Sequence, residues 1–298
     1  MAGRGLAPLA ALAAELGDLK RVRDARGPES IATRLFIQAW RAVVAGTPIP
    51  AVAETVTADA LAAIRLGAID MAMMRRIGMG GPAGRAVLSS SLDAVAAPLA
   101  PGMVARLTRA VGVPLPQAAT PEFVVALARQ PRAGATSPGK PRILLEPPES
   151  HADHCLVVAV LGCLFAGRYG GDPATVFLAG LIHHAHNAVL PDSGFAGEVM
   201  LGEHLAPIMH RLFAEAYATL PQGPAELARL AMVHAASADT PEGRAFNAAD
   251  VVDRVLQQRH YADVAGFTLD KAIGDLELVH AGPLQAFQND VLAEAGLA

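Results

Sequence analysis

Residues 150–171, SHADHCLVVAVLGCLFAGRYGG, decide the expected fold. Ser150 and Asp153 have nearly the spacing and chemistry of a capping box, which opens a helix. The apolar run CLVVAVLGCLFAG follows, and Gly170 with Gly171 stops the pattern. This run of 13 residues is shorter than the roughly 18–20 apolar residues that a membrane span requires. It therefore predicts a buried helix from about residue 151 to residue 168.

Helical patterns separated by Gly and Pro cover the rest of the chain. Asp172 and Pro173 supply an N-cap and a first-turn proline for a second helix that extends to about residue 188. Further helices are predicted at 30–45, 57–78 with Thr57 as its N-cap, 82–96, 101–111, 121–129, 198–219, 224–237, 247–262 and 283–296. No segment keeps the two-residue alternation of a half-buried strand, so an all-α fold is expected.

The distribution of charge divides the chain into two parts. Residues 1–150 contain 17 Lys plus Arg and 11 Asp plus Glu, a net charge of +6, whereas residues 151–298 contain 7 and 17, a net charge of −10. A stretch rich in Pro, Gly and Ser, residues 129–150, is typical of a linker between them. We therefore predict a helical N-terminal domain of unknown role, residues 1–140, followed by a second helical domain, residues 141–298.

The N-terminal sequence indicates a cytoplasmic protein. Glu15, Asp18 and Lys20 follow a short apolar stretch, and no convincing signal-peptide cleavage pattern accompanies it. Cys155 and Cys163 lie eight positions apart in one predicted helix, where their side chains are too far apart to form a disulfide. Both are expected to be free thiols in the core.

All ten histidines lie in the acidic part of the chain, at positions 151, 154, 183, 184, 186, 204, 210, 234, 260 and 280. His151 and His154 share one face of the first predicted helix, and His183 and His186 share one face of the second. If the two helices pack side by side, these imidazoles converge. An acidic, histidine-rich region suits a bound cation and a small-molecule substrate better than nucleic acid or a membrane surface. Homo-oligomerisation stays open.

Imidazole is a good ligand for divalent iron, manganese and zinc, and a carboxylate favours the first two. Asp250, on an otherwise apolar face of its predicted helix, is the candidate carboxylate, because a buried charge requires a partner. Asp192 lies in the turn PDSG, residues 191–194, directly after the histidine-bearing helix. This motif usually forms a simple turn, but Asp192 is also a candidate acid/base group.

The segments ADHCLVVAV, LAGLIHHAHN and AADVVDRV together resemble the HD-domain superfamily of helical metal-dependent phosphohydrolases. In that family the pattern is a histidine, then a His-Asp pair, then a distant aspartate. His154 matches the first histidine, His183 the histidine of the pair and Asp250 the final aspartate. His184 stands where the family has the metal-binding aspartate of the pair. The resemblance covers roughly residues 145–262.

The resemblance implies a metal-dependent hydrolase of a small phosphate ester or nucleotide, with His184 and Asp192 as candidate catalytic groups. Because the acidic part has few cations, arginines from the N-terminal part would have to help bind the phosphate. Some members of the superfamily are iron oxygenases with additional histidines between the pair and the last aspartate. His204 and His234 occupy such positions, which adds an iron oxygenase as an alternative. A non-catalytic binding or regulatory protein, with the histidines as polar core residues, is the third.

Overall fold

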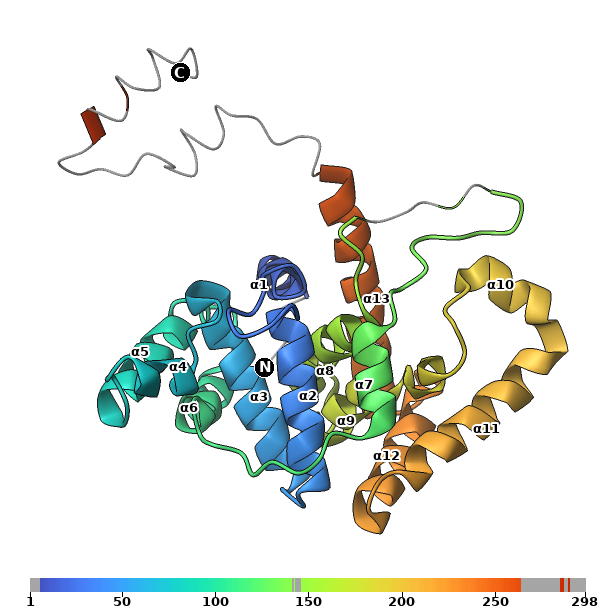
Figure 1. Cartoon of the computed structure of the whole chain (residues 1–298), viewed down its shortest axis with the longest axis horizontal. Coiled ribbons are helices and arrows are strands. Elements are labelled where there is room, and N and C mark those ends of the chain that lie inside the picture. The colour runs from blue at the N-terminus through green and yellow to red at the C-terminus, as the bar shows by residue number, and fades with distance from the viewer. Residues whose placement is uncertain (1–5, 141, 143–145, 264–284, 287–288, 290–298) are drawn as a thin grey trace. The chain divides into compact units, whose positions relative to one another are not determined.

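The computed structural model of the chain describes residues 6–140, 142, 146–263, 285–286 and 289. In these residues β-type pairing is limited to two isolated bridges, so the expected all-α fold is confirmed. Figure 1 shows the helices in chain order: α1 (Ala7–Asp18), α2 (Ile31–Val44), α3 (Ile49–Leu66), α4 (Met71–Arg76), α5 (Pro82–Asp93), α6 (Pro101–Ala110), α7 (Glu122–Arg129), α8 (His151–Tyr169), α9 (Pro173–Ile182), the 3-10 helix η1 (Ala185–Ala188), α10 (Gly194–Leu201), the 3-10 helix η2 (Gly202–His204), α11 (Leu205–Ala218), α12 (Gln222–Ala235) and α13 (Pro241–Asp263).

The helix predicted at 57–78 is wrong in its start and its length. α3 begins after Pro48, so Thr57 is a buried residue inside this helix instead of its N-cap. α3 ends at Gly67, whose φ of 57° lies in a region that glycine adopts without steric cost. Asp70 then starts α4 by accepting a hydrogen bond from the backbone N–H of Met73. Two helices therefore replace one.

Other predicted helices are shorter or interrupted. The second histidine-bearing helix ends at Ile182 and resumes as η1 after two non-helical residues. The segment 198–219 is divided at Gly202, which has a φ of 51°. α1 was not among the predicted helices, and the helix predicted at 283–296 falls largely outside the described residues.

Helix α8 is the central element of the core and contacts α1, α2, α3, α7 and α9. The predicted capping box is present: Ser150 Oγ accepts from the Asp153 N–H at 3.1 Å, and an Asp153 carboxylate oxygen accepts from the Ser150 N–H at 2.9 Å. Gly170, with a φ of 76°, ends the helix as predicted. Cys155 and Cys163 are buried and free. By length and composition α8 could cross a membrane, but 83% of its apolar window is buried inside the protein, so it is a core helix here.

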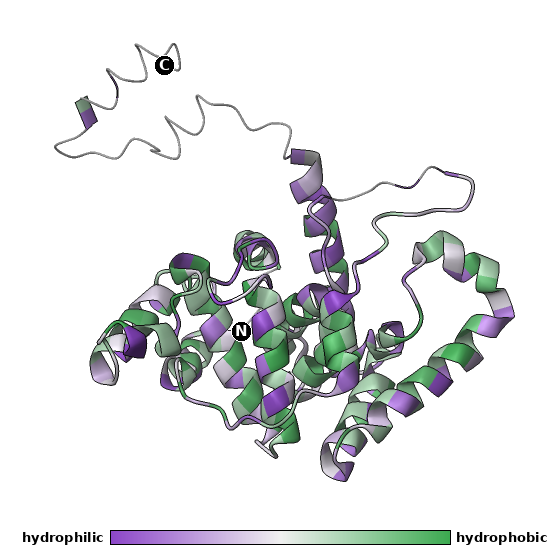
Figure 2. Ribbon diagram, viewed as in Figure 1, coloured by the Kyte–Doolittle hydropathy of each residue, from purple (hydrophilic) through white to green (hydrophobic). Residues whose placement is uncertain are grey.

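Hydrophobic packing explains this arrangement. All residues from His151 to Ala166 are buried, and they join side chains of α1, α2, α3, α7 and α9 in one continuous core. In Figure 2 most helices carry hydrophobic and hydrophilic residues on different faces, whereas α13 is predominantly hydrophilic. Residues on both sides of position 140 contribute to the core, and the predicted domain boundary there stays a prediction.

Contacts between Cα atoms group residues 1–256 into one unit and residues 257–298 into another. The described part of the second unit consists of residues 257–263, which end α13, together with residues 285, 286 and 289. All sites considered below belong to residues 1–256.

Polar contacts also connect α2 to α8. The carboxylate of Asp153 accepts hydrogen bonds from Ser30 Oγ and from Thr33 Oγ1, the latter at 2.8 Å. Ser30 at the same time caps α2 by accepting from the Thr33 N–H. Because Asp153 and Ser30 are each part of a helix cap, the starts of α2 and α8 are held together by one shared network.

Helices α8 and α9 approach closely because a glycine faces α8. A Cβ atom at Gly180 would lie 2.5 Å from the Cα of Ala159 and 2.6 Å from its backbone nitrogen. Gly180→Ala must therefore push the two helices apart, and we expect it to lower the free energy of unfolding by about 1–3 kcal/mol or more, as overpacked cores do. Urea-induced unfolding followed by circular dichroism measures this change.

Gly167→Ala is the matched control, because Gly167 lies on the exposed side of α8 and a Cβ there meets nothing within 4 Å. This variant is expected to raise stability by about 0.5–1 kcal/mol, the usual gain for alanine over glycine inside a helix. Equal stability of the two variants would show that the close approach at Gly180 is not needed.

Candidate metal centre

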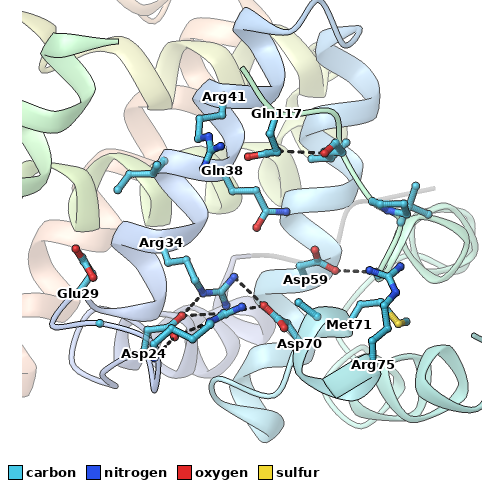
Figure 3. A pocket seen from close by; sticks show the side chains of 18 residues that line it. Asp24, Glu29, Arg34, Gln38, Arg41, Asp59, Asp70, Met71, Arg75 and Gln117 are labelled. Carbon is cyan, nitrogen blue, oxygen red and sulfur yellow. Dashed lines mark hydrogen bonds and ion pairs between the residues drawn. The ribbon is translucent and has the colours of Figure 1, made fainter. Parts of the chain in front are cut away.

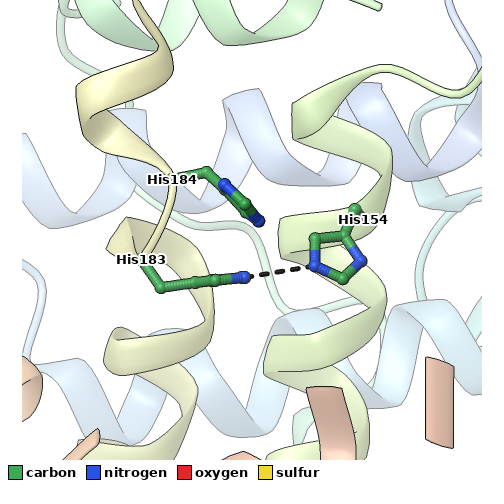
Figure 4. Close-up of side chains that lie close together, drawn as sticks. All are labelled: His154, His183 and His184. Atoms are coloured by element: carbon green, nitrogen blue, oxygen red, sulfur yellow. Dashed lines mark hydrogen bonds between the residues drawn. The ribbon is translucent and has the colours of Figure 1, made fainter. Parts of the chain in front are cut away.

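Three histidine rings meet where α8 faces the end of α9. His154 lies one turn into α8, while His183 and His184 follow the last residue of α9 (Figure 4). His183 and His184 are neighbours, and on a continuous helix their side chains would diverge by about 100°. The helix ends at Ile182, however, and the φ of −106° at His184 departs from helical geometry. As a result both rings turn toward His154, with their own centroids 4.3 Å apart.

The donor atoms of these rings have the spacing of metal ligands. His154 Nε2 and His183 Nε2 are 3.2 Å apart, and one ring nitrogen from each of the three residues falls within 4.8 Å of the others. Ligand bonds of about 2.1 Å place neighbouring donors roughly 3.0 Å apart in an octahedral and 3.4 Å apart in a tetrahedral site. The measured distance lies between these values, so the pair fits around one ion.

The opposite ring nitrogens are fixed by oxygen acceptors. His154 Nδ1 lies 2.7 Å from Asp253 Oδ2, His183 Nδ1 2.8 Å from the Gly180 carbonyl oxygen, and His184 Nδ1 2.8 Å from Asn187 Oδ1. An Nδ1–H that donates to each oxygen leaves the Nε2 lone pair directed at the common point. Metal-binding histidines in proteins are oriented in this way.

Burial keeps two of the three rings neutral. Loss of solvation lowers the pKa of His183 to about 3, and it lowers the pKa of His184 well below its usual value. Both rings are therefore unprotonated at neutral pH, and no proton has to leave before an ion binds. Cys155 Sγ lies 3.9 Å from His183 Nδ1, but burial raises the pKa of this thiol, so it is no thiolate ligand at neutral pH.

Asp250 lies beside this three-histidine group. Its Oδ1 is 3.3 Å from His154 Nε2, and its Oδ2 is 3.1 Å from a guanidinium nitrogen of Arg254. Burial alone would raise the pKa of Asp250, but the contacts with His154, His183 and Arg254 lower it to about 2. The group is an anion at neutral pH. His154, His183 and Asp250 thus lie together, as the sequence predicts, with Asp250 adjoining the group through His154.

A buried ionic network supports His154 from behind. Lys20 Nζ lies 2.7 Å from the Asp253 carboxylate and 3.3 Å from Glu149 Oε1, and at most 6% of any of these three side chains is exposed. Burial by itself lowers the pKa of Lys20, but Asp253 and Glu149 outweigh it and raise that pKa. Lys20 and His154 lower the pKa of Asp253, against the effect of burial. Asp253 therefore stays ionised and oriented toward His154.

Asp192 is separated from the three-histidine group by the side chain of His151. Its oxygens accept from the backbone N–H groups of Ala133 and Gly194, and Oδ2 lies 3.8 Å from His151 Nε2. The ring of His151, fully buried, lies 4.8 Å from that of His184 between centroids. Asp192 makes no direct contact with the group among the described contacts, and its role as an acid/base group stays a prediction.

The two additional histidines predicted as ligands lie elsewhere. His204 is exposed before α11, and His234 on α12 is 3.9 Å from Glu242. Among the described contacts none joins either residue to the three-histidine group. His184, predicted both as ligand and as catalytic group, does belong to it, and its Nε2 lies 3.4 Å from a guanidinium nitrogen of Arg132.

Four charged residues around the histidines were missed in the sequence: Lys20, Arg132, Glu149 and Asp253. The role of Asp253 could have been predicted from the sequence, because it lies three positions after Asp250 and therefore on the same face of α13. The roles of Lys20 and Arg132 could not, since only the tertiary fold brings them to residues more than 50 positions away.

Comparison of the chain with protein-family models, curated proteins and solved structures finds no match. Its function must therefore be argued from the site.

Asp253→Ala is expected to weaken metal binding by about 10–100-fold, the usual cost of losing a partner behind a ligating histidine. The reason is that His154 Nδ1 loses its acceptor and the ring its orientation. Asp253→Asn, whose amide oxygen can still accept that hydrogen bond, should lose less. Competition with a metal-chelating dye measures both affinities, and wild-type affinity in the alanine variant would contradict this role.

Proposed function

We propose that the chain is a cytoplasmic, metal-dependent hydrolase that resembles the HD superfamily and acts on a small phosphate ester or nucleotide. One observation carries this proposal: three imidazoles hold their Nδ1 atoms on oxygen acceptors and bring their Nε2 atoms together. Each Nε2 has a polar neighbour, since those of His154 and His183 contact each other and that of His184 faces Arg132. Buried histidines with a purely structural role would not need to turn the same ring nitrogen toward one point.

The residues present fit a divalent ion. His154, His183 and His184 would hold it, and the nearby carboxylate of Asp250 would supply an anionic donor. Three imidazoles suit zinc, and the added carboxylate also admits iron or manganese. When bound, such an ion supplies Lewis-acid activation of water at neutral pH.

The protein supplies cations for an anionic substrate. Arg132, on the segment after α7, reaches His184, and Arg254 pairs with Asp250. Arg132 thus borders the three-histidine group directly and Arg254 borders it through Asp250. Guanidinium is well suited to bind phosphate oxygens through two hydrogen bonds. Arg132 belongs to the part of the chain before residue 140. The sequence predicts that arginines from this part help to bind the phosphate group of the substrate.

His151 lies between Asp192 and His184 at the edge of the site. Burial lowers its pKa to about 2, so the ring is neutral at neutral pH. Asp192 lies beside its Nε2. A neutral imidazole with so low a pKa is a poor proton acceptor at neutral pH, so Asp192 is the group that we propose to exchange a proton with the substrate.

The test measures metal content and hydrolysis in the same preparation. Untagged protein is purified without chelators, its metals are counted by mass spectrometry, and iron-, manganese- and zinc-loaded samples are given a panel of phosphate monoesters, diesters and nucleotides. We expect about one bound ion per chain and release of phosphate or a nucleoside from one class of substrate. Metal-loaded protein that hydrolyses no member of the panel would refute the proposal, and substrate-dependent oxygen uptake by the iron form would replace it with an oxygenase.

A further inference from the structure

A cavity lies apart from the three-histidine group, between α2, α3, α4 and the segment after α6 (Figure 3). Its volume is about 660 Å³, within the range of pockets that bind metabolites and cofactors. Arg34, Ile37, Gln38 and Arg41 line it from one face of α2. None of its lining residues belongs to the metal centre.

One end of the cavity is closed by a neutral ionic network. Arg26 and Arg34 each contact both Asp24 and Asp70, which gives two cations and two anions. Burial opposes ionisation of Asp24, but the two arginines lower its pKa to about 2. These four side chains satisfy one another, so they shape the cavity and leave recognition of a ligand to other residues.

Arg41 lies at the opposite end in Figure 3, and Gln38 lies between the two ends. Arg41 is fixed there, because its Nε donates to the Ala118 carbonyl oxygen at 3.0 Å and its own carbonyl oxygen accepts from the Ala118 N–H at 3.1 Å. In the described part of the chain no carboxylate forms an ion pair with Arg41. Its terminal guanidinium nitrogens are therefore available to an anionic group in the cavity.

Asp59 supplies an acidic group in the wall of the cavity. Its Oδ1 accepts from the Gly112 N–H at 2.8 Å. Burial raises the pKa of Asp59 to about 7, against the effects of that hydrogen bond and of Arg34. Placing a carboxyl group in such surroundings costs free energy, and positions with this property are concentrated at binding sites. Ile37, Met71 and Leu115 add apolar surface to the lining of the cavity.

We propose that this cavity binds a mononucleotide-sized ligand, with an anionic group on Arg41 and hydrogen-bond donors on Asp59. The apolar side chains of the lining would contact a flat ring. A base with N–H donors would supply hydrogen bonds that the carboxyl group of Asp59 can accept. A purine or pyrimidine mononucleotide combines all three features. Because the site uses residues 24–117 alone, it does not depend on the function proposed for the metal centre.

Isothermal titration of the full-length protein with AMP, GMP, CMP and UMP tests the proposal. We expect at least one nucleotide to bind with a Kd below about 1 mM. Arg41→Met and Asp59→Asn should each raise that Kd at least about tenfold, the effect of losing a charged hydrogen bond. The His183→Ala variant should bind the nucleotide as the wild type does, because its substitution changes only the metal centre.

Hydrogen exchange provides a measurement that needs no variant. Bound nucleotide should protect amides in residues 34–41 and 112–117, and it should leave residues 151–187 unchanged. The proposal is overturned if none of the four nucleotides binds, or if protection and loss of binding follow His183 instead of Arg41 and Asp59. The latter outcome would assign the nucleotide to the metal centre as a substrate and leave the function proposed there intact.

Discussion

A His183→Ala variant is expected to retain less than about a tenth of the wild-type metal and to lose hydrolysis with it. Loss of a residue that only hydrogen-bonds to a ligating histidine already weakens metal binding by about 10–100-fold, and loss of the histidine itself should cost more. His183 Nε2 is one of the two nitrogens 3.2 Å apart at the centre of the group, and its ring also contacts Phe246 and the carbonyl oxygen of Gly180. Metal analysis by mass spectrometry and hydrolysis of the best substrate measure the two losses.

His204→Ala and His234→Ala are the matched controls for this experiment. Each removes one imidazole, and the sequence alone predicts that both residues bind metal. The structure places them away from the group, so we expect full metal content and activity in both variants. Loss of metal in these variants together with full retention in His183→Ala would mean that the ion binds elsewhere.

Lys20→Met is expected to lower the free energy of unfolding by about 3–5 kcal/mol, the cost of leaving buried charges without their partner. The substitution keeps the length of the side chain but leaves Asp253 and Glu149 facing each other in the core without a cation. Urea unfolding at neutral pH measures the change. Since Asp253 also orients His154, metal affinity should fall in the same variant.

Adding Glu149→Gln to Lys20→Met separates charge from packing. The double variant contains one fewer buried anion, so it should recover part of the lost stability if unpaired charge is the cause. Exposed ion pairs contribute less than about 1 kcal/mol. If Lys20→Met alone lowers the free energy of unfolding by no more than this, the contacts of Lys20 with Glu149 and Asp253 do not stabilise the fold.

Local signals were sufficient for the helices that carry the site. The capping box at Ser150, the glycine after α8 and the Asp172-Pro173 start of α9 all act within a few residues, and all are present in the structure. The division between α3 and α4 was missed because an apolar pattern continues across Gly67, which breaks the helix by adopting a positive φ. A periodic pattern alone does not show whether a glycine is helical or left-handed.

The composition of the metal centre was only partly predictable. His154 and His183 follow from their spacing on two helices, and Asp250 from its position among apolar residues. The convergence of His183 and His184 depends on where α9 ends, and neither glycine nor proline marks Ile182 as its last residue. Lys20, Arg132 and Glu149 come from parts of the chain whose path only tertiary packing determines.

The ion pair between Lys20 and Asp253 also has a consequence for protein synthesis. These residues are 233 positions apart, so the ribosome makes nearly the whole described chain before the pair can form. During translation α8 and α9 leave the ribosome before α13, so the three histidines are present before Asp250 and Asp253 are. Since we propose that Asp253 orients a metal-binding histidine and that Asp250 adds an anionic donor, we expect a nascent chain to bind metal weakly until α13 docks.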